Sequence, residues 1–387
     1  MADIGKSGLE EEAAAASGHM PAADFSNLRI LEIGEKRLIK NVMAAQTTHF
    51  STYFGDDSAN DPQGGSFVVS SRTFSRLLSA LRDPDLSLIV CHPTFFSPWH
   101  WRWLTRALFD RRVLQGHLPF VQAFGPQALR LPFKAPLAVL DFEDLPIINA
   151  NNLYLLKRCR LYFKRELPVD RWTLFLKTAH ANLPTPRFRR SASYAALLDK
   201  LRPISLGIPA GREAMLPAAT EKTTDLFFAG VVEGSASVRA RGMRELAMLR
   251  ERGIVVDIPE GRLPPEQFYR RFAQAWLTWS PEGLGWDCFR HYEAAGCGSV
   301  PLINHPTVER HAPLIEGVHA VYYDVEPGGL TRAITRALAD KTKLRVMADA
   351  AKAHVMAHHT SAAIARYAIG ATLAAHQERP GLPLSRE

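Results

Sequence analysis

Short apolar runs alternate with amphipathic stretches along most of the chain. In the first half, runs typical of buried strands cover residues 28–33, 66–70, 86–91, 137–141 and 160–163. Apolar side chains at helical spacing predict a short helix over residues 72–81 and a longer one over residues 99–113. Strands that alternate with helices predict a parallel sheet with helices on both faces.

The second half repeats this alternation more regularly. Strands are predicted over residues 225–229, 254–258, 276–280, 300–303 and 320–323. Helices are predicted over residues 238–252, 264–275, 288–295 and 308–315, and a long alanine-rich helical region over residues 331–376. We therefore expect an α/β protein made of two Rossmann-like, doubly wound domains, with a ligand in the inter-domain cleft where strand ends converge.

The chain of 387 residues is long enough for about two domains. Residues 1–24 are acidic and alanine-rich without a patterned apolar face, so we expect a flexible tail. Residues 201–209 join a helical tract to the second alternating region, and we place the linker between domains there. The predicted domains are residues 25–205, on the acceptor side, and residues 206–387, which include the C-terminal helices.

Composition narrows the class of protein. Hydrophobic residues make up 47% and charged residues 22% of the chain, as in ordinary globular proteins, and no apolar run is long enough to span a membrane. The four cysteines have no CxxC spacing, and the start has no secretory signal, so we expect a cytoplasmic protein. The formal net charge of +8 favours anionic partners without choosing among them.

Residues 280–303 combine a strand end, a glycine-rich turn, a helix and a second strand. Gly283 and Gly285 let backbone N–H groups approach a ligand closely, and the start of the following helix favours an anion such as a diphosphate. Arg290 offers forked donors to the same phosphates, and Glu293, at i+3, shares its helix face and suits vicinal sugar hydroxyls. An Arg–Glu pair at this spacing is also typical of a solvated helix surface.

This stretch resembles the C-terminal donor-binding domain of GT-B glycosyltransferases, closest to the exostosin-like and bacterial group-1-like enzymes. Their pattern is a glycine-rich turn, Arg, Glu, small residue and Gly, and then an apolar strand with Pro. Here it falls on Gly283, Gly285, Arg290, Glu293, Gly296, Pro301, Leu302 and Ile303. The segment 225–230, which ends at Gly230, is similar to the first strand and glycine turn of that domain.

The resemblance implies a transferase that moves a sugar from a nucleotide-sugar donor to an acceptor hydroxyl, in glycan or polysaccharide biosynthesis. It places Glu293 on the ribose and Arg290 on the donor phosphates, and it gives Arg239 or Arg241, after Gly230, a further phosphate contact. Arginines and a helix end would take the place of a divalent metal, so neither a metal nor another cofactor is expected.

One departure from the family leaves the stereochemical outcome open. Many retaining members carry a second glutamate eight residues before the first, and here that position is Gly285. A nucleotide-sugar epimerase on the same scaffold and a non-catalytic sugar- or partner-binding protein remain alternatives. Donor turnover without acceptor would favour the epimerase, and donor binding without turnover would favour the binding protein.

Acidic residues follow a predicted strand of the first domain. Asp141, Glu143 and Asp144 come directly after the run 137–140, where strand ends of a parallel sheet face a ligand. A carboxylate with a raised pKa would serve as general base in an inverting transfer, and Asp141 and Asp144 are the catalytic candidates, with Arg290. Each of these carboxylates could equally be a helix N-cap or a loop residue. His92, after the run 86–91, is a further candidate base.

The remaining signals concern partners. Trp99, Trp101 and Trp103 lie among arginines, as in an interfacial helix, which suggests peripheral contact with the inner membrane face and a glycan or lipid-linked acceptor; such a stretch is also typical of a core helix. His354 and His358 have metal-ligand spacing without the acidic residue of a zinc motif, so no metal site is assigned. Nothing beyond net charge points to nucleic acid.

Overall fold

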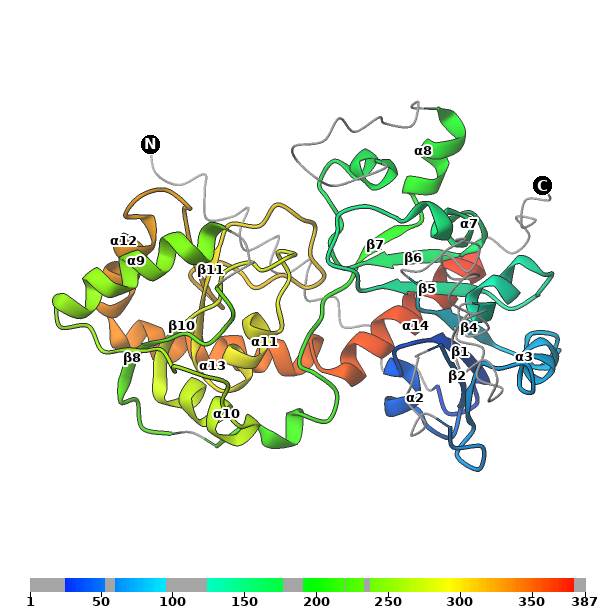
Figure 1. The fold of residues 1–387 in the computed structure, drawn as a ribbon, viewed down its shortest axis with the longest axis horizontal. Helices are drawn as coiled ribbons and strands as arrows, with labels where there is room; N and C mark the ends of the chain where they lie inside the picture. The colour runs from blue at the N-terminus through cyan, green and yellow to red at the C-terminus, as the bar shows by residue number, and fades with distance from the viewer. Residues whose placement is uncertain are drawn as a thin grey trace, which may run out of the picture.

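The computed structural model describes residues 25–52, 60–94, 124–176, 191–218, 220–232 and 237–378. These residues form two lobes, each built on a sheet of parallel strands, as Figure 1 shows. The sequence-based prediction of two doubly wound α/β sheets is confirmed.

The first sheet has seven strands in the order β3-β2-β1-β4-β5-β6-β7. They are β1 (Ile30–Gly34), β2 (Thr47–Ser51), β3 (Ser66–Val68), β4 (Leu88–Cys91), β5 (Leu137–Asp141), β6 (Leu161–Lys164) and β7 (Leu201–Pro203). Every neighbouring pair is parallel, and β1 lies between β2 and β4, so that Ile33 pairs with Phe50 on one side and Cys91 on the other. The strand order reverses between β1 and β4, which makes this the switch point of the sheet.

The second sheet has five parallel strands in the order β12-β11-β10-β8-β9. They are β8 (Thr224–Phe227), β9 (Val256–Asp257), β10 (Ala275–Trp279), β11 (Val300–Asn304) and β12 (Val321–Tyr323). Its switch point lies between β8 and β10. In doubly wound sheets, ligands bind outside the carboxyl ends of the strands at this point.

Helices cover both faces of each sheet. In the described ranges, the α-helices are α2 (Leu38–Val42), α3 (Phe74–Leu81), α7 (Leu153–Arg158), α8 (Ala192–Leu198), α9 (Ser237–Glu251), α10 (Pro265–Gln274), α11 (Phe289–Gly296), α12 (Gly329–Leu338), α13 (Lys341–His358) and α14 (Ser361–Glu378). Short 3₁₀ turns span Ala128–Arg130, Ala150–Asn152, Arg171–Phe175 and Glu213–Met215. Pro265 opens α10 in the first turn, where its missing N–H needs no partner.

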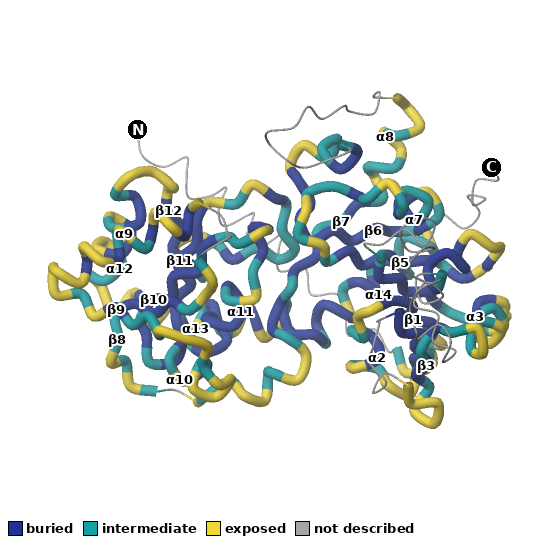
Figure 2. The backbone as a smooth tube through the Cα atoms, in the orientation of Figure 1, coloured by how far each residue is buried: buried dark blue, intermediate teal, exposed yellow. Residues whose placement is uncertain are grey.

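Alternate side chains of a central strand pack on opposite faces of the first sheet. In β5, Leu137 and Val139 join the cluster under α3 and α7, whereas Ala138 and Leu140 face the other way. This second cluster includes Ile364 and other apolar residues of α14. Buried backbone is accordingly concentrated in the strands of both lobes (Figure 2).

The placement of α14 differs from the expectation that all the C-terminal helices belong with residues 206–387. After α13, the chain crosses back, and α14 packs against β5, β6 and α2 of the first sheet (Figure 1). The physical reason is its apolar face, because Ile364, Ala368 and Ile369 complete a cluster that the first half leaves open. The chain passes from the first sheet to the second between Pro203 and Thr224.

The sequence pattern was wrong in three places. Residues 47–51 form β2 although mostly polar, and the predicted linker 201–209 begins with edge strand β7. The helix predicted over 308–315 is absent, and that stretch is irregular with Ala312 in the left-handed region (φ 39°). Pro313 has no N–H for a helix, and the Ala312 carbonyl instead accepts hydrogen bonds from His354 and His359.

The predicted tail 1–24 and the predicted helix 99–113, with its tryptophans, lie outside the described residues. Within the described ranges, no helix combines the length and apolar character that crossing a membrane requires.

Candidate functional site

The switch point of the second sheet brings two predicted glycine turns together. Gly230 follows β8, and the segment 281–288, here called the donor loop, follows β10 and leads into α11. The loop is tight, because the Gly283 N–H donates to the Gly285 carbonyl at 2.9 Å. This is the place where a doubly wound sheet binds a ligand.

Arg290, in the first turn of α11, spans both turns. Its Nη1 donates to the Ala229 carbonyl at 3.1 Å, and its Nη2 lies 3.5 Å from the Pro281 carbonyl. Gly230 leaves room for it, because a Cβ at that position would overlap Nη1. The buried Nε of Arg290 has no partner among the described residues.

Arg239, near the start of α9, reaches the same turns from the other side. It is buried, and its Nε and Nη1 donate to the carbonyls of Glu282 and Val231 at 2.9 and 2.7 Å. A Cβ on Gly283 would lie 2.7 Å from Arg239 Nη2, so this glycine too makes room for a guanidinium. Arg241, the other predicted candidate, is exposed on α9.

The two guanidinium groups lie close enough for their positive charges to repel each other. Burial and the neighbouring charge of Arg290 lower the pKa of Arg239. Within the described ranges, neither arginine forms an ion pair with a carboxylate, and their partners are backbone carbonyls. Two adjacent cations beside the start of a helix form a site for a phosphate or diphosphate.

Glu293 lies one turn after Arg290 on α11, where α11 packs against α10. Its buried carboxylate accepts a hydrogen bond from the Tyr269 hydroxyl of α10 at 2.6 Å. Burial raises the pKa of Glu293, although Tyr269, Arg212 and Arg290 act against that rise. Sequence reasoning missed Tyr269, because nothing in the spacing of α10 indicates that this aromatic residue meets Glu293 rather than only the core.

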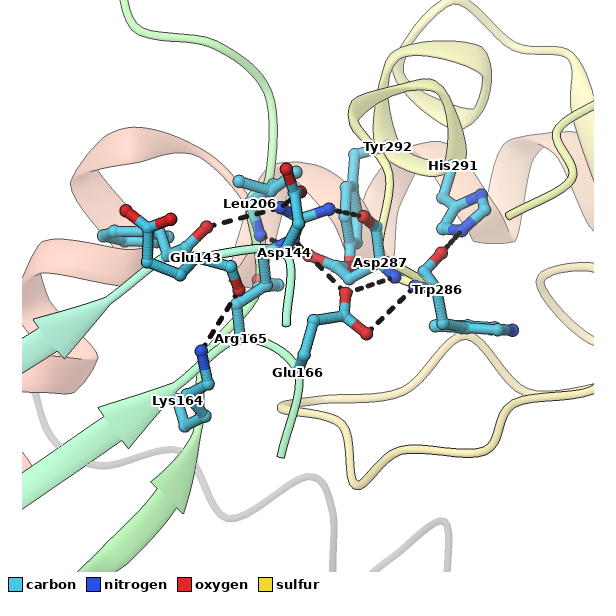
Figure 3. A network of polar contacts seen from close by, with 12 residues as sticks. Glu143, Asp144, Lys164, Arg165, Glu166, Leu206, Trp286, Asp287, His291 and Tyr292 are labelled. Carbon is cyan, nitrogen blue, oxygen red and sulfur yellow. Dashed lines mark hydrogen bonds and ion pairs between the residues drawn. The ribbon is translucent and has the colours of Figure 1, made fainter. Parts of the chain in front are cut away.

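Gly285 makes room for a side chain of the first lobe. Glu166, just after β6 in the first sheet, places its carboxylate where a side chain at residue 285 would lie, and a Cβ there would be 2.6 Å from Glu166 Cδ. The two carboxylate oxygens accept the N–H groups of Trp286 and Asp287 (Figure 3). The boundary between the two sheets therefore includes the donor loop itself.

Arg165 and Asp287 extend this network. The Arg165 guanidinium contacts the Asp287 carbonyl, and its Nε lies 3.4 Å from Glu166 Oε1. Asp287 in turn accepts the Leu206 N–H at 2.7 Å and the Tyr292 hydroxyl (Figure 3). The cations of Lys164 and Arg165 are thus paired with carboxylates. The sequence gives no signal for the contact with Asp287, because that residue follows Arg165 by 122 positions.

Asp141, at the end of β5, is enclosed by structural partners. Its oxygens accept the Tyr162 hydroxyl at 2.6 Å, Lys164 Nζ at 3.0 Å and the Glu143 N–H at 3.0 Å. Lys164 is fully buried. A carboxylate so occupied favours a structural role over proton transfer.

The two acidic residues that follow have different surroundings. Asp144 is ion-paired with Arg165 and is about half exposed. Partial burial and the neighbouring carboxylates of Asp141 and Asp144 raise the pKa of Glu143, and Lys164 and Lys36 oppose that rise. Of the three carboxylates, Glu143 best fits the requirement for a general base.

His92 follows β4 at the switch point of the first sheet. Its Nε2 lies 2.9 Å from Oε1 of the buried Glu32, and its buried Nδ1 has no partner in the described part of the chain. Burial acts to raise the pKa of Glu32. The hydrogen bond and the charge of His92 outweigh this effect and keep that pKa below its usual value. Glu32 is therefore an ionised residue that orients the His92 ring.

His354 and His358, which have metal-ligand spacing in the sequence, pack against each other at the end of α13. His354 Nε2 is hydrogen-bonded to the Ala312 carbonyl, and its ring is tilted against that of His358, 4.8 Å away. Among the described residues, no three His, Cys, Asp or Glu side chains gather where they could hold a metal ion.

Comparisons with known proteins agree with this architecture. Residues 248–370 match the family described as "Glycosyl transferase-like". The solved glycosyltransferase from Rickettsia africae ESF-5 is 7% identical, with a TM-score of 0.54 over 91% of this chain and 100% of that chain. An α-glucosyltransferase solved with UDP and a 13-mer DNA is 10% identical, with a TM-score of 0.51 over 89% and 99%. None of the curated proteins has a significantly similar sequence.

At these identities, the structural likenesses establish the fold, and the family match covers a segment that runs from α9 through the second lobe into α14. The donor loop, α11 and Arg290 all lie within residues 248–370. Residues 248–370 are thus similar to the glycosyl transferase-like family, in a chain whose two parallel sheets have the GT-B fold.

Proposed function

We propose that this protein is a glycosyltransferase that moves a sugar from a nucleotide-sugar donor to an acceptor hydroxyl. The observation that carries the proposal is the pair Arg239 and Arg290, held by backbone carbonyls at the switch point of a glycosyl transferase-like domain. Two cations without carboxylate partners in the described residues fit a diphosphate, the leaving group of a nucleotide sugar.

The arginines act on the leaving group. As the sugar departs, negative charge grows on the diphosphate, and guanidinium groups already in place stabilise it without reorganising. The start of α11, where no side chain caps the helix among the described residues, adds the partial positive charge of a helix N-terminus. These charges perform the task that a divalent cation performs elsewhere, so the transfer is proposed to proceed without a metal.

Glu293 is proposed to bind the ribose of the donor. One of its oxygens holds the Tyr269 hydroxyl, and the other has lone pairs for a sugar hydroxyl. Tyr269 keeps the carboxylate in one position, which lowers the entropic cost of binding a flexible side chain to the ligand.

The acceptor is proposed to bind at the carboxyl edge of the first sheet. An inverting transfer needs a general base there, and Glu143 is proposed for it because its pKa is raised and its carboxylate is exposed, whereas Asp141 and Asp144 are paired with cations. A glycan or lipid-linked hydroxyl is the proposed acceptor, as in the exostosin-like and bacterial group-1-like enzymes that the motif resembles.

The first experiment is a thermal-shift screen of nucleoside diphosphates and nucleotide sugars, with and without EDTA. UDP is the first probe, because the α-glucosyltransferase of similar fold was solved with it. A ligand that binds only the folded protein raises its melting temperature. A shift that survives EDTA and is lost in Arg290→Ala supports the proposal.

Turnover assays separate the alternatives. If the nucleoside diphosphate is released only when an acceptor is present, the protein is a transferase. Conversion of the donor sugar without an acceptor supports an epimerase. Binding without any turnover supports a non-catalytic sugar-binding protein. No shift with any nucleotide contradicts the proposal.

A further inference from the structure

We propose that Glu166, a residue of the first lobe, is a positioning residue for the donor site of the second lobe. It would act by holding the donor loop, residues 281–288, in the shape that aims Arg239 and Arg290 at the phosphates. The inference rests on the proposed function, because it assumes that these arginines bind the donor.

The Glu166 carboxylate is bound at both oxygens to donor-loop backbone. Oε2 accepts the Trp286 N–H and Oε1 accepts the Asp287 N–H, each at 2.9 Å (Figure 3). The side chain is only 4% exposed. Two charge-assisted hydrogen bonds inside a buried site fix this part of the loop, just before α11 begins at Phe289.

Gly285 is complementary to this carboxylate. A Cβ at residue 285 would overlap Glu166 Oε1, and no positive φ requires a glycine there. Lack of space, and not backbone conformation, therefore requires a glycine at residue 285. Gly285 gives the donor loop no acidic side chain of its own, and the space that it leaves is filled by the carboxylate of Glu166 from the first lobe.

The same network ties down the segment that connects the lobes. Asp287 accepts the N–H of Leu206, which follows the last strand of the first sheet, and its carbonyl contacts the Arg165 guanidinium. Arg165 also balances the buried negative charge of Glu166. Strand end β6, the connecting segment and the donor loop thus meet at one cluster.

Movement of the donor loop would displace both arginines that are proposed to bind the phosphates. The Glu282 carbonyl holds Arg239 Nε, and the Pro281 carbonyl lies against Arg290 Nη2. Both carbonyls belong to the segment that Glu166 fixes a few residues later. The donor site is therefore complete only when the two lobes are in contact, which couples donor binding to their arrangement.

The test compares Glu166→Ala, Glu166→Gln and Gly285→Ala with Glu309→Ala. Glu309 is the matched control, because it too is a carboxylate that joins the lobes, through an ion pair with Arg171 at 2.7 Å, and among the described residues it makes no contact with the donor loop. Melting temperature and circular dichroism establish that each variant folds. Hydrogen exchange of the peptide containing residues 284–289 then reports on the loop without any ligand.

Affinity for UDP and for inorganic pyrophosphate is measured on the same proteins. We expect faster exchange in this peptide and at least about tenfold weaker binding for Glu166→Ala and Gly285→Ala, with a smaller loss for Glu166→Gln, which keeps one acceptor oxygen. Glu309→Ala should match the wild type in both. Because Glu166→Ala and Gly285→Ala break the same contact, the double variant should bind no worse than the poorer single variant.

The outcomes separate the two proposals. If the wild type binds the probes and folded Glu166→Ala binds them equally well, the positioning role is overturned while the proposed function stands. If Glu309→Ala weakens binding as much as Glu166→Ala, general contact between the lobes, and not this carboxylate, is responsible, which also overturns it. If the wild type binds neither UDP nor pyrophosphate nor any other nucleotide, the proposed function fails first.

Discussion

Arg290 occupies the space that a side chain at residue 230 would need. Its Nη1 lies so close that a Cβ on Gly230 would overlap it, while the same nitrogen donates to the Ala229 carbonyl. The turn after β8 and the first turn of α11 are therefore fitted to each other. A glycine is needed at residue 230 because the Arg290 guanidinium fills the space of a side chain there.

The first prediction follows from this fit. Gly230→Ala should displace the Arg290 guanidinium and weaken nucleoside diphosphate binding about tenfold, which corresponds to the loss of one hydrogen bond to a charged group. Isothermal titration calorimetry measures it. Gly261→Ala is the control, because nothing lies within 4 Å of a Cβ at that exposed glycine. Equal affinity of both variants would mean that Arg290 does not bind the donor.

The second prediction concerns the arginines on α9. Arg239→Ala should reduce donor affinity roughly 10- to 100-fold, because a buried cation facing the phosphates is removed. Arg241→Ala should change it less than about twofold, because Arg241 is exposed and any interaction it makes is screened by solvent. A larger effect for Arg241 than for Arg239 would place the phosphates elsewhere.

The third prediction separates Glu293 from the residue that holds it. Glu293→Ala should weaken binding of a nucleoside diphosphate but leave affinity for pyrophosphate nearly unchanged, because only the former has a ribose. Tyr269→Phe should have a smaller effect in the same direction, since it removes one hydrogen bond to the carboxylate. If both probes lose affinity equally, Glu293 supports the loop and not the ribose.

The fourth prediction is a pH dependence of turnover. A general base must be ionised, and the pKa of Glu143 is raised by partial burial and by Asp141 and Asp144, so activity should fall with acidification at a higher pH than for an ordinary carboxylate. Glu143→Gln should lower kcat about 100-fold and abolish this limb of the profile. Unchanged kcat would remove Glu143 from the reaction and favour a retaining transfer, which product NMR then checks.

The fifth prediction concerns stability. The neutral ring of His291 is hydrogen-bonded to Ser280 Oγ and the Trp286 carbonyl, and burial lowers its pKa to about 3. Below about pH 6.5, His291 is protonated in the unfolded state but stays neutral in the folded state. The free energy of unfolding should therefore fall as the pH drops toward 3. His291→Gln should melt lower at pH 7 but show a flatter pH dependence of Tm. His305→Gln, at an exposed histidine, is measured beside it as the control substitution.

Local pattern was sufficient for most of the fold and for part of the site. The apolar runs and glycine turns of the second half predict β8, β10, β11 and α11 correctly, because each combines a buried face with its own stop signal. The turns after β8 and β10 also bring Gly230, Gly283, Arg239 and Arg290 together as expected.

What the pattern missed depends on contacts between distant segments. Strand β2 is polar in sequence and is buried only because β1 and β3 flank it. The irregular stretch around Ala312 is held by histidines of α13 and its end. Glu166 looks like an ordinary loop glutamate until its partners, 120 residues later, are placed beside it. No local periodicity carries such information.

The crossing of α14 has a consequence for synthesis on the ribosome. The first sheet is otherwise complete at Pro203, but the helix that covers one of its faces begins only at Ser361. While the intervening segment is being translated, Leu140, Phe163 and their neighbours lack the cover that α14 gives them on that face. The nascent chain must therefore carry an unfinished amino-terminal lobe until nearly all of the second lobe has been made, and chaperones that shield apolar surface are expected to bind it during that interval.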